Sequence, residues 1–112
     1  LVIPVPLHPV RHRSRGFNQA YLLARPWGKS VNRDVLKRRR STPPQTGLGK
    51  KMRQSNIRGA FWTKDSKAVC GKRILLVDDV YTTGATVGEC ARVLVRNGAA
   101  QVDVLTVARA VV

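Results

Sequence analysis

The run Arg73-Ile-Leu-Leu-Val-Asp-Asp-Val-Tyr-Thr-Thr-Gly-Ala-Thr86 determines the fold that we expect for this chain. Its apolar part, Ile74 to Val77, is typical of a parallel strand that is buried on both faces. After Thr86 the spacing becomes helical, and apolar residues recur on one face at Val87, Cys90, Ala91 and Leu94. A second apolar run, Val102 to Ala108, completes a strand-helix-strand unit. The pattern predicts an α/β fold, a parallel sheet with helices on both faces.

The residues between the first strand and the helix form a candidate anion site. They are Thr82, Thr83, Gly84, Ala85 and Thr86. Their backbone N–H groups open a helix, where the helix dipole favours a negative charge. Gly84 lets the backbone approach the anion closely, because glycine has no Cβ atom. We therefore expect these five residues to bind a phosphate.

Asp78 and Asp79 come just before this loop, from which two residues separate them. Adjacent carboxylates at a strand end can accept hydrogen bonds from the vicinal hydroxyls of a sugar. They can also help to hold Mg²⁺, which commonly bridges carboxylates and substrate phosphates. The alternative interpretation is a simple turn with a helix cap. The complete string, an acid pair followed by Thr-Thr-Gly-x-Thr and an amphipathic helix, favours a phosphosugar site.

The string from Val77 to Thr86 resembles the phosphoribosyl pyrophosphate (PRPP) signature of type I phosphoribosyltransferases. Three further pieces resemble, in the same order, the ComF family of competence and DNA-utilisation proteins. They are Val5-Pro-Leu-His-Pro9, Arg15-Gly-Phe-Asn-Gln19, and Gln45 followed by Arg53, Asn56 and Gly59-Ala-Phe61. The resemblance covers nearly the whole chain and implies a type I phosphoribosyltransferase fold. It also implies that Asp78 and Asp79 are catalytic residues that help to hold Mg²⁺.

The resemblance assigns roles to two basic segments. In type I transferases the loop after the first strand binds pyrophosphate, which makes Arg15 the best candidate for this role, because a guanidinium chelates phosphate oxygens. Residues 41–58 are polar, basic and rich in turn formers, and the fold uses such a segment as a lid. Lys51 and Arg53 would supply positive charge when the lid closes.

Two functions follow as alternatives. The first is Mg²⁺-dependent transfer of a phosphoribosyl group from PRPP to an unknown acceptor, linked to DNA uptake or utilisation. Transferases that salvage 6-oxopurines have an aspartate where this chain has Thr82, which argues against that substrate class. The second is a non-catalytic module that senses PRPP or a nucleotide and binds DNA through its basic half.

The net charge of +15 is distributed unevenly. Residues 1–64 contain 15 Lys and Arg against one acid, Asp34, whereas residues 65–112 contain six against five. A small phosphorylated ligand needs only a few cations, so the excess suggests a polyanion. We expect single-stranded DNA to contact basic residues 11–58. A solvated basic surface is the alternative, especially for the run from Lys37 to Arg40.

The chain of 112 residues is expected to form one phosphoribosyltransferase-like domain, residues 1–112. ComF relatives carry an N-terminal cysteine-rich zinc motif that is not found here, so we expect a truncated core. Cys70 and Cys90 are too few for a zinc site and are interpreted as packing residues. No run has transmembrane length and no secretory signal is visible, which predicts a cytoplasmic protein without membrane insertion. A homo-oligomer or the competence machinery are candidate partners.

Four weaker elements complete the prediction. A first strand is expected from Leu1 to Leu7, and a helix from near Asn18 that Pro26 should break or kink. Short strands are expected from Val31 to Leu36 and after Gly59.

Overall fold

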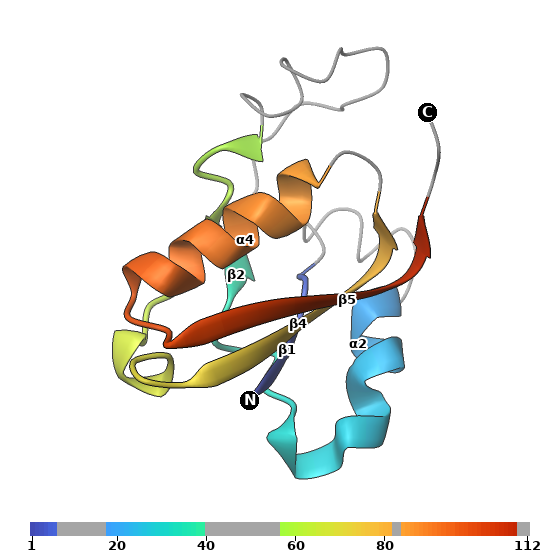
Figure 1. Cartoon of the computed structure of the whole chain (residues 1–112), viewed down its shortest axis with the longest axis horizontal. Helices are drawn as coiled ribbons and strands as arrows, with labels where there is room; N and C mark the ends of the chain where they lie inside the picture. Colours follow the sequence, from blue (N-terminus) through green and yellow to red (C-terminus); the bar gives the residue numbers. More distant parts are fainter. Residues whose placement is uncertain (7–17, 40–56, 82–83, 110–112) are drawn as a thin grey trace.

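Within the described residues, the central sheet of the computed structural model has three parallel strands (Figure 1). The structure describes residues 1–6, 18–39, 57–81 and 84–109. Strand β4 (Arg73–Tyr81) lies in the middle, between β1 (Val2–Pro4) and β5 (Gln101–Arg109). The register pairs Leu75 with Val2 on one side and with Asp103 on the other. The two strands predicted before and after the helix are therefore confirmed as parallel neighbours.

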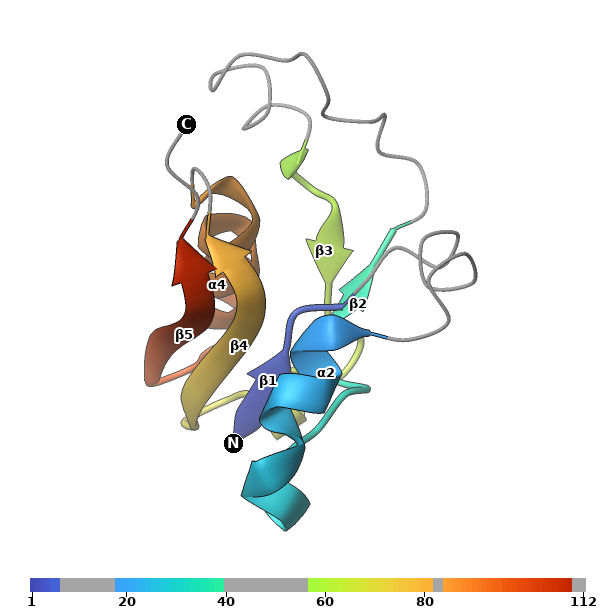
Figure 2. The same cartoon turned by 90° about the vertical axis from the view of Figure 1, so that its right-hand side faces the viewer.

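Two helices cover opposite faces of this sheet (Figure 2). Helix α4 (Ala85–Arg96) follows β4 and packs its buried Val87, Cys90 and Leu94 into one cluster with Ile74 and Leu76. Helix α2 (Gln19–Ala24) packs Ala24 against Val2 and Val77 on the other face. Successive residues of a strand point to opposite faces, which is why the apolar run of β4 serves both clusters. The expected α/β fold with helices on both faces is confirmed.

The start and end of α2 follow from single residues. The Asn18 side chain accepts hydrogen bonds from the backbone N–H groups of Ala20, at 2.9 Å, and Tyr21, at 3.4 Å. The α-helix ends before Pro26, and the chain continues as the 3-10 segment η1 (Arg25–Ser30) with a kink at Gly28. The break predicted at Pro26 is confirmed.

A two-stranded antiparallel ribbon lies outside the main sheet. It consists of β2 (Lys37–Arg38) and β3 (Phe61–Trp62), and β3 contacts α4. The strand after Gly59 was expected, whereas the strand predicted from Val31 to Leu36 was wrong. Val31 makes only an isolated parallel bridge to Val2, and the Asn32 side chain then accepts a hydrogen bond from the Asp34 N–H, which turns the chain.

The loop between β3 and β4 contains a 3-10 turn, η2 (Ser66–Ala68), and packs against the end of α4. A Cβ atom at Gly98 would lie 3.1 Å from the Cys70 Sγ, and Gly98 has a φ of +96°. Cys70 is exposed and Cys90 is buried, and both are free thiols. Burial raises the pKa of the Cys90 thiol well above its usual range, so Cys90 is an inert core residue.

Candidate functional site

Asp78 and Asp79 lie near the carboxyl end of β4, the central strand, and both are half-buried. The backbone N–H of Asp79 donates a hydrogen bond of 2.9 Å to the Asp78 Oδ1 atom. Because side chains alternate along a strand, Asp78 lies on the α4 face and Asp79 on the α2 face. A single ligand can therefore contact both carboxylates only across the carboxyl edge of the sheet, where ligands of open parallel sheets bind.

The environment of Asp78 favours its protonated form. Burial raises the pKa of Asp78 to about 7, and the neighbouring Asp79 carboxylate adds to the increase. The hydrogen bond from the Asp79 backbone and the positive charge of Arg38 oppose this shift. A carboxyl group that titrates near neutrality in the middle of a sheet is costly for stability, and such groups concentrate at functional sites.

Arg38 belongs to this site, although the sequence interpretation had placed it in an exposed basic run. It comes from β2, is half-buried, and has its guanidinium 5.3 Å from the centre of the Phe61 ring. The neighbouring Lys37 instead approaches Asp34, with 3.6 Å between the charged groups. Side chains alternate along a strand, so Lys37 and Arg38 lie on opposite faces of β2. Had this strand been predicted, the alternation could have indicated that Arg38 belongs to the site.

Thr106 is a second residue that sequence reasoning missed. It lies on β5 and is paired with Asp78 in the parallel register. Its hydroxyl therefore belongs to the same face of the sheet, at the same level along the strands. No local motif marks Thr106, because only the register of two strands brings it beside the acid pair.

Helix α4 begins at a glycine with a left-handed backbone conformation. Gly84 is the N-terminal cap of the helix, with φ +79° and ψ 1°, and as a glycine it provides no side-chain cap itself. The Gly88 N–H donates to the Gly84 carbonyl at 2.8 Å and closes the first helical turn. Ala85 and Thr86 are the first helical residues. The predicted phosphate-binding residues Gly84, Ala85 and Thr86 thus follow the acid pair within one strand-loop-helix unit.

Five predicted site residues lie outside the described part of the chain: Arg15, Lys51, Arg53, Thr82 and Thr83. Most of the lid predicted over residues 41–58 lies outside it as well.

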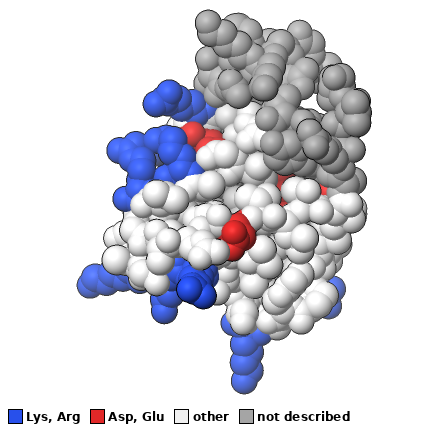
Figure 3. Space-filling model, viewed as in Figure 1, with Lys and Arg blue, Asp and Glu red and all other residues white. Residues whose placement is uncertain are grey.

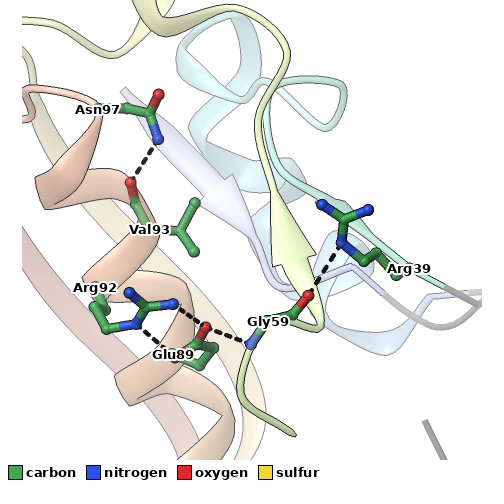
Figure 4. A network of polar contacts seen from close by, with 6 residues as sticks. All are labelled: Arg39, Gly59, Glu89, Arg92, Val93 and Asn97. Atoms are coloured by element: carbon green, nitrogen blue, oxygen red, sulfur yellow. Dashed lines mark hydrogen bonds and ion pairs between the residues drawn. The ribbon is translucent and has the colours of Figure 1, made fainter. Parts of the chain in front are cut away.

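A buried acid on α4 forms a second polar cluster (Figure 4). Glu89 is 7% exposed, and its carboxylate accepts two hydrogen bonds from the Arg92 guanidinium, at 2.8 and 2.6 Å. It also accepts the Gly59 N–H at 2.8 Å. The hydrogen bonds from Arg92 hold the pKa of Glu89 below its usual value, and the Gly59 bond adds to this effect. Sequence reasoning missed Glu89, because Gly59 is 30 residues away along the chain.

Basic side chains gather over α4 and beside it on the face shown in Figure 3, around a small acidic patch. Among the described residues, no helix has the length and apolar character needed to cross a membrane.

Comparisons with known proteins agree with this geometry. The family model described as "Phosphoribosyl transferase domain" matches residues 13–111. The chain is 40% identical over 112 residues to DNA utilization protein YhgH of Escherichia coli O157:H7, a match that covers 96% of this chain and 48% of that protein. No solved structure gives a significant match.

Two other relatives carry names that refer to competence. Competence protein F of Haemophilus influenzae is 38% identical over 97% of this chain and 50% of its own length. Competence protein ComFC of Bacillus subtilis is 36% identical over 97% of this chain and 44% of its own length. The chain thus spans about half the length of the curated relatives that it matches.

Proposed function

Because the chain belongs to the phosphoribosyl transferase domain family and is similar to DNA-utilisation and competence proteins, we propose that it binds PRPP and transfers the phosphoribosyl group to an acceptor. The observation that carries this proposal is the half-buried acid pair at the end of β4, followed by a helix that opens on a glycine with positive φ. The pKa of Asp78 is raised to about 7. Burying such a carboxyl costs stability, so a purely structural role does not explain its presence.

In this proposal the predicted site residues contact different parts of the ligand. The backbone of Gly84, Ala85 and Thr86, together with Thr82 and Thr83, binds the 5-phosphate at the start of α4. Asp78 and Asp79 accept hydrogen bonds from the ribose hydroxyls at the carboxyl edge of the sheet. Arg15 holds the pyrophosphate, and Lys51 and Arg53 contribute charge from a lid over it.

The donor set suits Mg²⁺ bound together with substrate. Carboxylate oxygens are the hard ligands that Mg²⁺ prefers, and one or two of them suffice when phosphates supply the remainder. The described residues contain no group of three or more His, Cys, Asp or Glu side chains that could hold a metal alone. Asp78 and Asp79 would hold the ion, directly or through water, and it would neutralise charge on the leaving pyrophosphate.

The reaction that this site supports is a displacement at C1 of the ribose. The bond from C1 to the pyrophosphate oxygen breaks, a bond from C1 to the acceptor nucleophile forms, and pyrophosphate leaves with the electron pair. Positive charge develops on the ribose ring on the way. The protein groups act mainly by positioning the ribose and by stabilising charge. Thr82 argues against a 6-oxopurine acceptor.

A second candidate function is a non-catalytic PRPP or nucleotide sensor that binds single-stranded DNA. The net charge of +15 and the names of the relatives favour a connection with DNA. In either case we propose that the protein acts in DNA uptake or utilisation in the cytoplasm, together with partners from the competence machinery or a second copy of the chain.

Labelled PRPP separates the two functions. Pyrophosphate release is measured with nucleobases, amines and single-stranded DNA as acceptors, for the unchanged protein and for Asp79→Asn. A matched control is Asp103→Asn, which changes an exposed carboxylate on β5. Release that depends on Asp79 and not on Asp103 supports the enzyme. Binding of PRPP without release for any acceptor supports the sensor. The absence of PRPP binding refutes the enzyme, and the absence of both PRPP and nucleotide binding refutes the sensor as well.

A further inference from the structure

A cavity of about 310 Å³ lies between the turn before β3 and helix α4. Its lining residues are Ile57, Arg58, Gly84, Ala85, Gly88, Glu89 and Arg92. A Cβ atom at Gly88 would meet no other atom within 4 Å, so this wall is bare helix backbone beside open space. The cavity begins at the candidate anion loop and continues along α4 as far as Arg92. At 1.5 Å per residue this length is roughly 12 Å, more than one phosphate group occupies.

Glu89 joins the two walls of the cavity (Figure 4). Its carboxylate binds Arg92 on its own helix and the backbone N–H of Gly59 on the opposite wall. The Gly59 carbonyl in turn accepts a hydrogen bond of 3.1 Å from the Arg39 Nε atom. One buried carboxylate therefore holds both walls and two arginines in a single network.

Arg58 precedes Gly59 in the chain, lines the cavity and supplies an available cation. Its side chain is exposed, and it makes no ion pair within residues 1–6, 18–39, 57–81 and 84–109. Its charge reaches Glu89, where it helps to lower the pKa of that carboxyl. Two arginines, Arg58 and Arg92, thus accompany one glutamate at the cavity, which leaves a local charge of +1. A surface of this charge attracts an anion.

We propose that this cavity binds a phosphodiester group of single-stranded nucleic acid, with Arg58 as the contacting cation and Glu89 as the residue that positions it. The proposal rests on the DNA connection of the proposed function and gives it a place on the molecule. Among the lining residues that the structure describes, none is aromatic. The contact is therefore with the phosphate backbone and not with stacked bases, and it is independent of sequence.

The test is the fluorescence anisotropy of a labelled oligothymidine strand at several salt concentrations. Arg58→Ala should weaken binding about tenfold, because a charge-assisted hydrogen bond is lost, and reduce the salt slope by about 0.7. Arg25→Ala removes an equal charge from the exposed segment η1 and should change the affinity less than twofold. Equal losses for both variants would mean that only total charge matters and would overturn the proposal.

Glu89→Gln separates positioning from charge. The substitution raises the net charge by one, so a purely electrostatic surface would bind the strand more tightly. If Glu89 positions the arginines, binding should weaken severalfold in spite of the added charge. A thermal melt of the same sample shows whether the variant is folded, and tighter binding by a folded variant contradicts the positioning role.

Calorimetry with PRPP and Mg²⁺ distinguishes this site from the phosphosugar site. Arg58→Ala should bind PRPP as well as the unchanged protein does. Loss of PRPP binding with unchanged oligothymidine binding would assign the cavity to PRPP and overturn the inference. If the unchanged protein binds PRPP but no oligothymidine, the inference fails and the proposed PRPP site stands.

Discussion

At the scale of single residues, Asp78 carries the clearest conflict between stability and function. Its carboxyl is half-buried on the α4 face of β4, where burial and the adjacent Asp79 raise its pKa to about 7. A side chain that served only folding would avoid this cost. The acid pair was predicted from the sequence, because both residues follow an apolar strand. The pKa was not predictable, because it depends on Arg38 and on the packing of α4.

Asp78→Asn should make the ligand-free protein more stable. The substitution removes a carboxylate that burial disfavours, and an asparagine oxygen can still accept the Asp79 N–H. We expect the free energy of unfolding at pH 8 to rise by about 1–2 kcal/mol, well under the full value of the shift, because the half-exposed group is partly solvated. Urea denaturation measures this change. Asp103→Asn is the control, and a loss of stability in Asp78→Asn would contradict the account.

The same group predicts a pH dependence of stability. The folded-state pKa of Asp78 is raised from an ordinary 3.8 to about 7, so the folded state binds more protons between these values. The contribution of Asp78 to stability therefore falls as the pH rises through this window. The difference in stability between Asp78→Asn and the unchanged protein should be near zero at pH 3.5 and reach its maximum above pH 7. A difference that is constant with pH would show that Asp78 does not titrate there.

At the scale of elements, the strand-loop-helix unit was predictable and the ribbon beside it was not. The apolar run of β4 and the helical spacing of α4 are local patterns, and the structure reproduces both. The pairing of β2 with β3 joins Arg38 to Phe61, which are far apart in the sequence. A strand of two residues is also too short for its alternating pattern to be recognised in the sequence. The Glu89 network depends on the same long-range contact. Its residues were therefore missed together.

Two glycines of this unit should respond oppositely to substitution. Gly84→Ala places a Cβ atom at φ +79° and should cost about 1–2 kcal/mol of stability and weaken PRPP binding. Gly88→Ala lies within α4 beside open space and should stabilise the protein by up to about 1 kcal/mol, because alanine is the better helix former. Thermal melts and PRPP calorimetry of the two variants check both signs. Similar effects of the two substitutions would contradict the assigned loop geometry.

At the scale of the whole molecule, the fold brings cations from the basic residues 1–64 next to residues 65–112, in which acidic and basic residues are nearly equal in number. Arg39 and Arg58 belong to residues 1–64, which have a net charge of +14. Arg58 lines the cavity beside the Glu89–Arg92 ion pair, and Arg39 is joined to Glu89 through the Gly59 backbone (Figure 4). The fold class and the excess of charge were both predictable from the sequence. The location of these cations beside α4 was not, because it requires the path of the chain between β2 and β3.

The central claim is that the acid pair and the start of α4 form a PRPP site. The most direct test is a calorimetric titration of PRPP with Mg²⁺ into the unchanged protein, the double variant Asp78→Ala with Asp79→Ala, and the control Asp103→Ala. We predict saturable binding that the double variant loses and the control retains. Equal affinity in all three proteins would contradict the account.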